Sequence, residues 1–112
     1  MRRIRGEIVL PADSPAAAAG LVLAEVRDVS LMDVPSTVVA EWRRTDVPVA
    51  PGGRIPFELD VPEGDQGRSL SVRAHVSFDG SGVVRPGDLL TVTVIPVSPR
   101  GVGPIEVPTA VI

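Results

Sequence analysis

The residues best suited to catalysis lie on one expected strand. His75 is the only histidine of the chain, and Ser71 and Ser77 flank it. Together with a carboxylate such as Asp60 they supply the groups of a hydrolase triad. No Gly-x-Ser-x-Gly turn presents a serine, however, and a flat strand does not aim a nucleophile. The alternation of Arg73, His75 and Ser77 predicts a solvated histidine on a polar face. We therefore expect no catalytic residues and no enzymatic activity.

Acidic side chains gather in the expected turns, where carboxylates also cap the backbone. They are Asp28, Asp33, Glu63, Asp65, Asp79 and Asp88. None follows the ligand spacing of a calcium loop, although weak adventitious calcium binding at Glu63 and Asp65 is an alternative. The glycine pairs at 80–82 and 101–103 lack the third glycine and the helix of a phosphate-binding loop. We expect no metal ligands and no cofactor.

The chain has three aromatic residues, Trp42, Phe57 and Phe78. Trp42 alternates with Val38 and Ala40, and both phenylalanines also fall on apolar faces. All three are therefore predicted in the core, which argues against the exposed aromatic platforms that carbohydrate modules and single-strand binders use.

Charge and cysteine content exclude further classes. The net charge is -3, and the eleven basic residues, all arginine, are scattered. Nucleic acid is not an expected partner, because no basic patch is present to hold it. The absence of cysteine excludes structural disulfides, thiolate catalysis and cysteine zinc sites.

Alternating apolar residues predict an all-β fold. Turn signals separate about seven strands, the pattern of an antiparallel two-sheet immunoglobulin-like sandwich. The expected strands are 4–10, 21–28, 37–44, 54–61, 69–78, 89–97 and 105–111, within one domain spanning 1–112. The alanines of 11–20 allow one helical turn.

The segments 54–61 and 69–78 are separated by a turn-like stretch, which predicts a hairpin. Pairing apolar with apolar residues puts Val61 opposite Leu70 and Glu58 opposite Arg73 on the outer face.

Targeting signals are weak. The basic start and the apolar run 16–24 imitate a secretory signal, but Glu7, Pro11 and Asp13 interrupt it. No apolar run reaches the roughly 18 residues of a transmembrane helix. The expected location is cytoplasmic as given, or periplasmic or cell-envelope if an export signal has been removed.

Three blocks carry a family resemblance. They are Leu21-Val-Leu-Ala-Glu-Val-Arg-Asp-Val-Ser-Leu-Met-Asp-Val-Pro-Ser, Ile55-Pro-Phe-Glu-Leu-Asp-Val and Ser69-Leu-Ser-Val-Arg-Ala-His-Val-Ser-Phe-Asp-Gly. Over most of its length the chain resembles the YbaY/YscW-like family of small bacterial lipoprotein domains, which includes pilotin chaperones of type III secretion secretins. The resemblance implies a β-sandwich that binds a protein partner and has no active site. Since the chain has no cysteine to carry a lipid, we expect no lipid anchor.

The leading functional hypothesis is a non-catalytic protein-interaction or chaperone-like module. A free sheet edge can accept an extended peptide, and the apolar segment 102–112 is the candidate edge. Its expected partner-binding residues are Ile105, Val107, Val111 and Ile112, for a protein partner or for self-association, unless the segment only completes its own sheet. The alternative is a small-ligand or carbohydrate-binding sandwich, and an enzyme ranks third.

Overall fold

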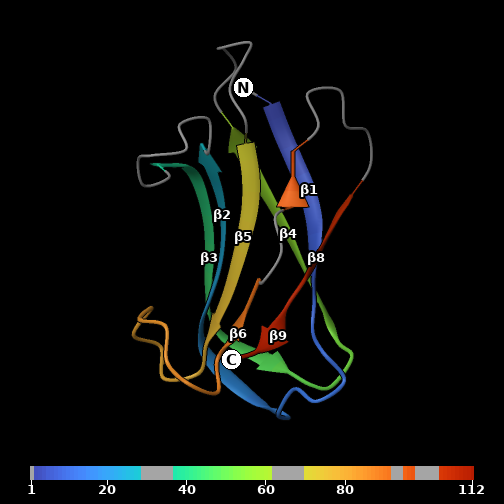
Figure 1. Cartoon of the computed structure of the whole chain (residues 1–112), viewed down its shortest axis with the longest axis vertical. Coiled ribbons are helices and arrows are strands. Elements are labelled where there is room, and N and C mark those ends of the chain that lie inside the picture. The colour runs from blue at the N-terminus through green and yellow to red at the C-terminus, as the bar shows by residue number, and fades with distance from the viewer. Residues whose placement is uncertain (1, 29–36, 62–69, 92–94, 98–103) are drawn as a thin grey trace.

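Strands account for nearly all regular structure in the computed structural model, which describes residues 2–28, 37–61, 70–91, 95–97 and 104–112 (Figure 1). This part of the chain contains β1 (Arg2–Val9), β2 (Ala17–Asp28), β3 (Thr37–Val49), β4 (Arg54–Val61), β5 (Leu70–Ser77), β6 (Leu89–Leu90), β7 (Ile95–Pro96), β8 (Ile105–Pro108) and β9 (Ala110–Val111). The predicted strands 89–97 and 105–111 are each split in two. Residues 11–20 form a turn and the start of β2 in place of the predicted helical turn.

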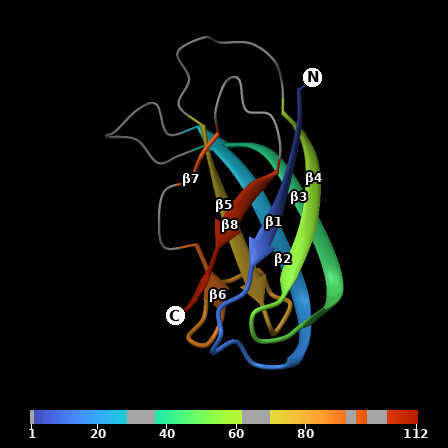
Figure 2. The ribbon, with the colours of Figure 1, turned by 90° about the vertical axis from the view of Figure 1, so that its right-hand side faces the viewer.

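The strands form two sheets, which confirms the predicted sandwich. The smaller sheet has the order β4-β1-β8, and the larger has the order β3-β2-β5-β6-β9 with β7 also beside β5. Figure 2 shows the small sheet lying over the large one. One pairing differs from the antiparallel prediction, because β8 runs parallel to β1, with Gly6 opposite Ile105 and Ile8 opposite Val107.

The core lies between the sheets and consists of small aliphatic side chains. In β4, exposed and buried residues alternate along the whole strand, as predicted. Val22, Ala24 and Val26 of β2 and Val72, Ala74 and Val76 of β5 are likewise buried. Branched side chains suit such a surface because they pack well on a pleated sheet.

The alternation of inward-facing and outward-facing side chains in β3 changes phase at Asp46. Trp42 and Arg44 stand opposite Ala24 and Val22, whose side chains face the core. Directly opposite residues of an antiparallel pair share a face, so both point to the inner side of the sheet. Asp46 has a φ of 54°, and beyond it Val47 and Val49 become the buried residues. The inner face of β3 therefore changes from even to odd positions.

The predicted hairpin between β4 and β5 is wrong. β4 pairs with β1, which places Glu58 opposite Arg5. β5 pairs with β2 in the other sheet, which places Arg73 opposite Glu25. β4 and β5 thus lie in different sheets, and apolar alternation, which both sheets require equally, could not indicate which strands are partners.

The prediction of a solvated His75 is also wrong. Its position on the face opposite Ala74 and Val76 is correct, but the side chain is 1% exposed. The segment after β5 folds back so that the carboxylate of Asp88 meets the imidazole. The outer face of β5 is therefore covered at this point, a long-range contact that strand periodicity does not report.

Candidate functional site

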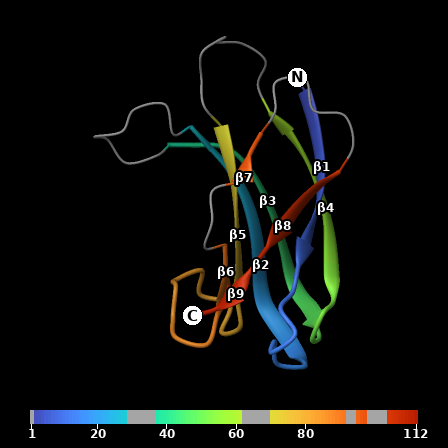
Figure 3. The same ribbon diagram turned by 45° about the vertical axis from the view of Figure 1, so that its right-hand side comes forward.

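A hollow of the described surface lies between two sheet edges. β3 is the last strand of the large sheet and β4 the last strand of the small one. They are joined by a tight turn in which Gly53 N donates to Ala50 O at 3.0 Å. From this turn the two strands diverge, as Figure 3 shows, so that their edges separate toward the other end of the sandwich. A cleft of about 560 Å³ opens between them.

Two aromatic rings lie at the centre of this cleft. The rings of Trp42 from β3 and Phe57 from β4 have centroids 6.2 Å apart and are tilted by 50°. The remaining lining residues come mainly from the strands beside them: Arg5, Gly6, Glu7, Arg43, Arg44, Pro56, Glu58 and Pro104. Aromatic side chains contribute large apolar contact areas at interfaces.

The absence of a side chain at position 6 allows this arrangement. A Cβ on Gly6 would lie 2.5 Å from Cζ of Phe57 and 2.7 Å from the carbonyl oxygen of Ile105. The ring of Phe57 therefore rests directly on the backbone of β1. Gly6 thus positions one of the two aromatic residues of the cleft.

The placement of Trp42 corrects part of the sequence analysis. Phe57 is buried, as predicted, whereas Trp42 is half-buried and lines the cleft while packing against the core. Trp42 points to the predicted face, but β3 is an edge strand, so its inner face is open on one side. The sequence does not reveal the order of the strands in the sheet, so it could not indicate that Trp42 lies on an edge strand.

The charges around the cleft are almost all neutralised by neighbours. Glu58 lies 3.8 Å from Arg5 and also contacts Arg3 at 2.8 Å. Glu7 lies 3.9 Å from Arg54. Arg43 lies 3.5 Å from Glu41.

Arg44 differs from these lining residues. It is exposed, and within the described ranges no acidic side chain pairs with it. Its position two residues from Trp42, on the same side of β3, puts an unneutralised cation beside the aromatic rings. The cleft therefore combines an apolar centre with one positive charge.

The predicted triad residues are separated by the fold. Asp60 lies on β4 and accepts a hydrogen bond from Arg3 Nε at 3.2 Å, whereas Ser71 and Ser77 lie on β5 in the other sheet. Ser77 Oγ donates to Asp79 Oδ1 at 3.0 Å, and Ser77 is fully buried. These groups do not form a nucleophile and base.

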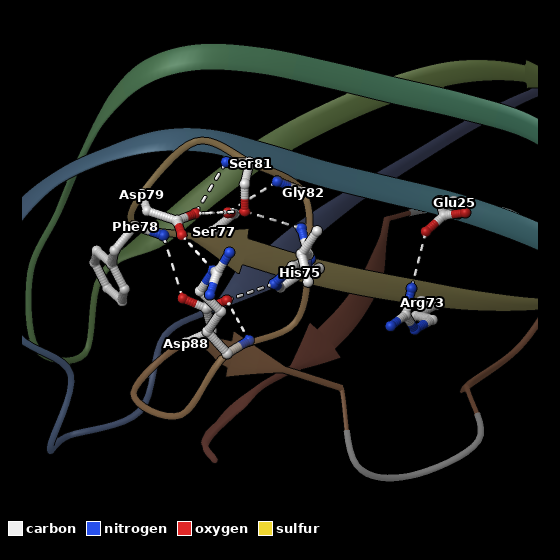
Figure 4. A network of polar contacts seen from close by, with 11 residues as sticks. Glu25, Arg73, His75, Ser77, Phe78, Asp79, Ser81, Gly82 and Asp88 are labelled. Atoms are coloured by element: carbon white, nitrogen blue, oxygen red, sulfur yellow. Dashed lines mark hydrogen bonds and ion pairs between the residues drawn. The ribbon is translucent and has the colours of Figure 1, made fainter.

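His75 instead belongs to a buried polar network (Figure 4). Its Nε2 lies 2.9 Å from Oδ2 of Asp88. The same carboxylate accepts Arg85 N at 3.1 Å and Phe78 N at 3.3 Å. Asp88 therefore ties the segment 78–88 to β5, which is a structural role that sequence reasoning missed.

Asp79 organises the tip of that segment. Its Oδ1 accepts hydrogen bonds from Ser81 N at 2.9 Å and Ser81 Oγ at 2.7 Å. These bonds, the backbone one foremost, lower the pKa of Asp79 from 3.8 to about 2, because they stabilise the ionised carboxylate. The network explains why this turn is acidic without invoking a metal.

The predicted partner-binding residues lie on two edge strands. Val107 of β8 is fully buried opposite Ile8, and Ile105 is half-buried opposite Gly6. Val111 and Ile112 follow on and after β9 and are 38% and 40% exposed. The segment therefore contributes to both sheets, while its last two side chains remain accessible.

Two other predictions concern metals and membranes. Glu63 and Asp65 lie outside the described residues, and the described ones hold no group of three or more potential metal ligands. Within the same part of the chain no helix has the length and apolarity needed to cross a membrane.

Comparison with known proteins identifies a shared fold. No protein-family model and no curated protein matches this sequence. The structure is similar to that of an alternative pilotin from the type II secretion system of Vibrio cholerae, with a TM-score of 0.69 and 24% identity. The match covers 97% of this chain and 96% of that one. The predicted likeness to pilotin-type domains is thus confirmed for the fold, while membership of the YbaY/YscW-like family stays a prediction.

Proposed function

We propose that this chain is a non-catalytic protein-binding module and that its partner docks in the cleft between β3 and β4. The observation that carries the proposal is the half-buried Trp42, which meets Phe57 in an open cleft between two sheet edges. Accessible aromatic side chains in a concave site are characteristic anchors of protein interfaces. None of the groups in the cleft forms a nucleophile and base pair, which favours binding over catalysis.

The setting proposed for this module is a bacterial secretion or envelope-assembly system. The support is the fold shared with an alternative pilotin of a type II secretion system, together with the sequence resemblance to pilotin-type lipoprotein domains. The partner would then be a component of the secretion machinery, such as a secretin, and the module would act at the cell envelope.

Site-specific cross-linking in the source organism tests this proposal. A photoreactive amino acid is placed at Arg43 or Pro104, which line the cleft, and as a control at Val83, which is 56% exposed on another loop. We expect the two cleft positions to capture one and the same protein, and Trp42→Ala to reduce this capture. Capture from Val83 alone, or from no position, would contradict the proposal.

A small-ligand or carbohydrate module is the second candidate, and the open position of Trp42 favours it. Since Trp42 is the only tryptophan, intrinsic fluorescence reports on the cleft directly. Titration with cellobiose, maltotriose and N-acetylglucosamine should leave the emission unchanged if the cleft binds protein. A saturable change that Trp42→Phe abolishes would favour the carbohydrate reading.

A further inference from the structure

The edge of β3 beside the cleft has a backbone able to accept another strand. β3 ends the order of the large sheet, so no described strand pairs with its outer side. Such an edge presents unpaired N–H and C=O groups, and an extended peptide can add to it.

Only part of this edge is suitable. Pro48 lacks an N–H, and Asp46, with a φ of 54°, bends the strand. Residues 38–43 contain neither proline nor glycine, and Val38 is 40% exposed. A peptide would therefore add most readily to residues 40–43 of this half, beyond the register shift with β2 beside Ala40, and these residues border the cleft.

The side chains on the inner face of this half define what the peptide must carry. Residues directly opposite one another on neighbouring strands interact. Trp42 would face an apolar side chain, and Arg44, the lining charge without an ion-pair partner in the described residues, would face an acidic one.

We propose that the cleft binds an extended peptide that adds to β3, with an acidic side chain opposite Arg44 and an apolar side chain opposite Trp42. The acidic and apolar residues are then separated by one position. In an antiparallel complex the acidic residue comes first, and in a parallel complex the apolar residue does. This inference rests on the proposed function and specifies the chemistry of its partner.

The competing explanation is that Arg44 protects the edge. Charged side chains that point inward on an edge strand prevent pairing with a second copy. In that case Arg44 would have no preference for acidic peptides, and its removal would cause self-association.

A display library separates these explanations. The probe is a library of peptides in which Thr and Val alternate around three adjacent randomised positions. The targets are the full chain, Arg44→Glu, and the control Arg85→Glu, which makes the same change of charge on the loop that carries Val83, away from the cleft-lining residues. All three are checked for folding by thermal denaturation.

We expect the unchanged protein and Arg85→Glu to enrich peptides in which an acidic and an apolar residue are separated by one intervening position. Arg44→Glu should enrich a basic residue at the acidic site. Affinity of the best acidic peptide should fall by up to about fivefold in Arg44→Glu, since an exposed pair contributes up to about 1 kcal/mol. Enrichment of the same motif by the unchanged protein and by Arg44→Glu would overturn the proposal. Self-association of an Arg44→Val variant, without any preference of the unchanged protein for acidic peptides, would overturn it as well.

Amide hydrogen exchange tests the added strand itself. Binding of the enriched peptide should slow exchange in residues 38–43, and N-methylation of alternate peptide residues should abolish binding. Unchanged exchange there would refute strand addition. If cleft positions still cross-link a partner while these tests fail, the proposed function stands and this inference falls; if no cleft position cross-links, the proposed function falls by itself.

Discussion

The imidazole of His75 and the carboxylate of Asp88 meet at 2.9 Å, and the two side chains are 1% and 5% exposed. This contact joins the middle of β5 to the residue just before β6. Through it the outer face of β5 is covered at His75.

Replacing Asp88 by Ala should destabilise the fold by about 3 kcal/mol, because buried polar groups lose their hydrogen-bond partner. The orphaned groups are His75 Nε2, Arg85 N and Phe78 N. Urea denaturation measures the change. Asp60→Ala is the control, since Asp60 pairs with Arg3 at an exposed position and its loss should be small. Equal effects of the two substitutions would mean that the buried contact adds nothing.

Gly6→Ala should destabilise by about 1 to 3 kcal/mol, as overpacking of a filled site does. The new methyl group would collide with the Phe57 ring and with the backbone oxygen of Ile105. Gly53→Ala is the matched control, because its nearest contacts are 3.1 and 3.3 Å away. A shift in Trp42 emission for Gly6→Ala alone would confirm that Gly6 sets the geometry of the cleft.

Phe57→Ala should lower the free energy of unfolding more than Trp42→Ala does. Phe57 is 4% exposed, so its truncation should cost about 3 to 5 kcal/mol. Trp42 keeps one side in the open cleft and therefore loses less buried area. Thermal denaturation of both variants checks the order, and the reverse order would place Trp42 in the core after all.

Stability should depend on Asp79 in acid. Its pKa is about 2 in the folded protein and 3.8 ordinarily. The folded state therefore favours the charged form, so the stabilisation is present above pH 3.8 and is lost as the pH falls toward 2. Unfolding free energies of the unchanged protein and of Asp79→Asn should converge across this interval. If the difference between the two unfolding free energies stays constant over this pH interval, protonation of Asp79 is not coupled to folding.

Removal of the residues after Pro104 should abolish cooperative folding. Val107 is fully buried, and Thr109 bonds Val9 O through both its N at 3.0 Å and its Oγ1 at 2.9 Å. Circular dichroism and gel filtration would detect the loss. A truncated chain with an unchanged melting temperature would mean that β8 and β9 are dispensable.

Sequence periodicity predicted the side-chain faces better than the neighbours of each strand. The alternation of β4 holds at every position, and His75 lies on the face opposite Ala74 and Val76, as expected. Its burial follows from Asp88, whose approach no local pattern encodes.

The cleft could not be predicted for a related reason. Trp42 reads as a core residue by alternation, and only the position of β3 at the end of its sheet leaves the ring accessible. From the sequence Arg44 likewise has the character of a surface charge. Only its pairing opposite Val22 shows that it lies on the inner face of the sheet. Glu58 and Arg73 were expected to pair, yet each found its partner within its own sheet.

The position of β1 between β4 and β8 bears on how the protein is made. β1 pairs with one of the last strands of the chain, and Thr109 bonds Val9 across a separation of 100 residues. Contacts of such long range form slowly, because a large loop must close first. A growing polypeptide cannot complete its small sheet until β8 has left the ribosome. One edge of β1 therefore stays unpaired until almost the whole chain has been synthesised.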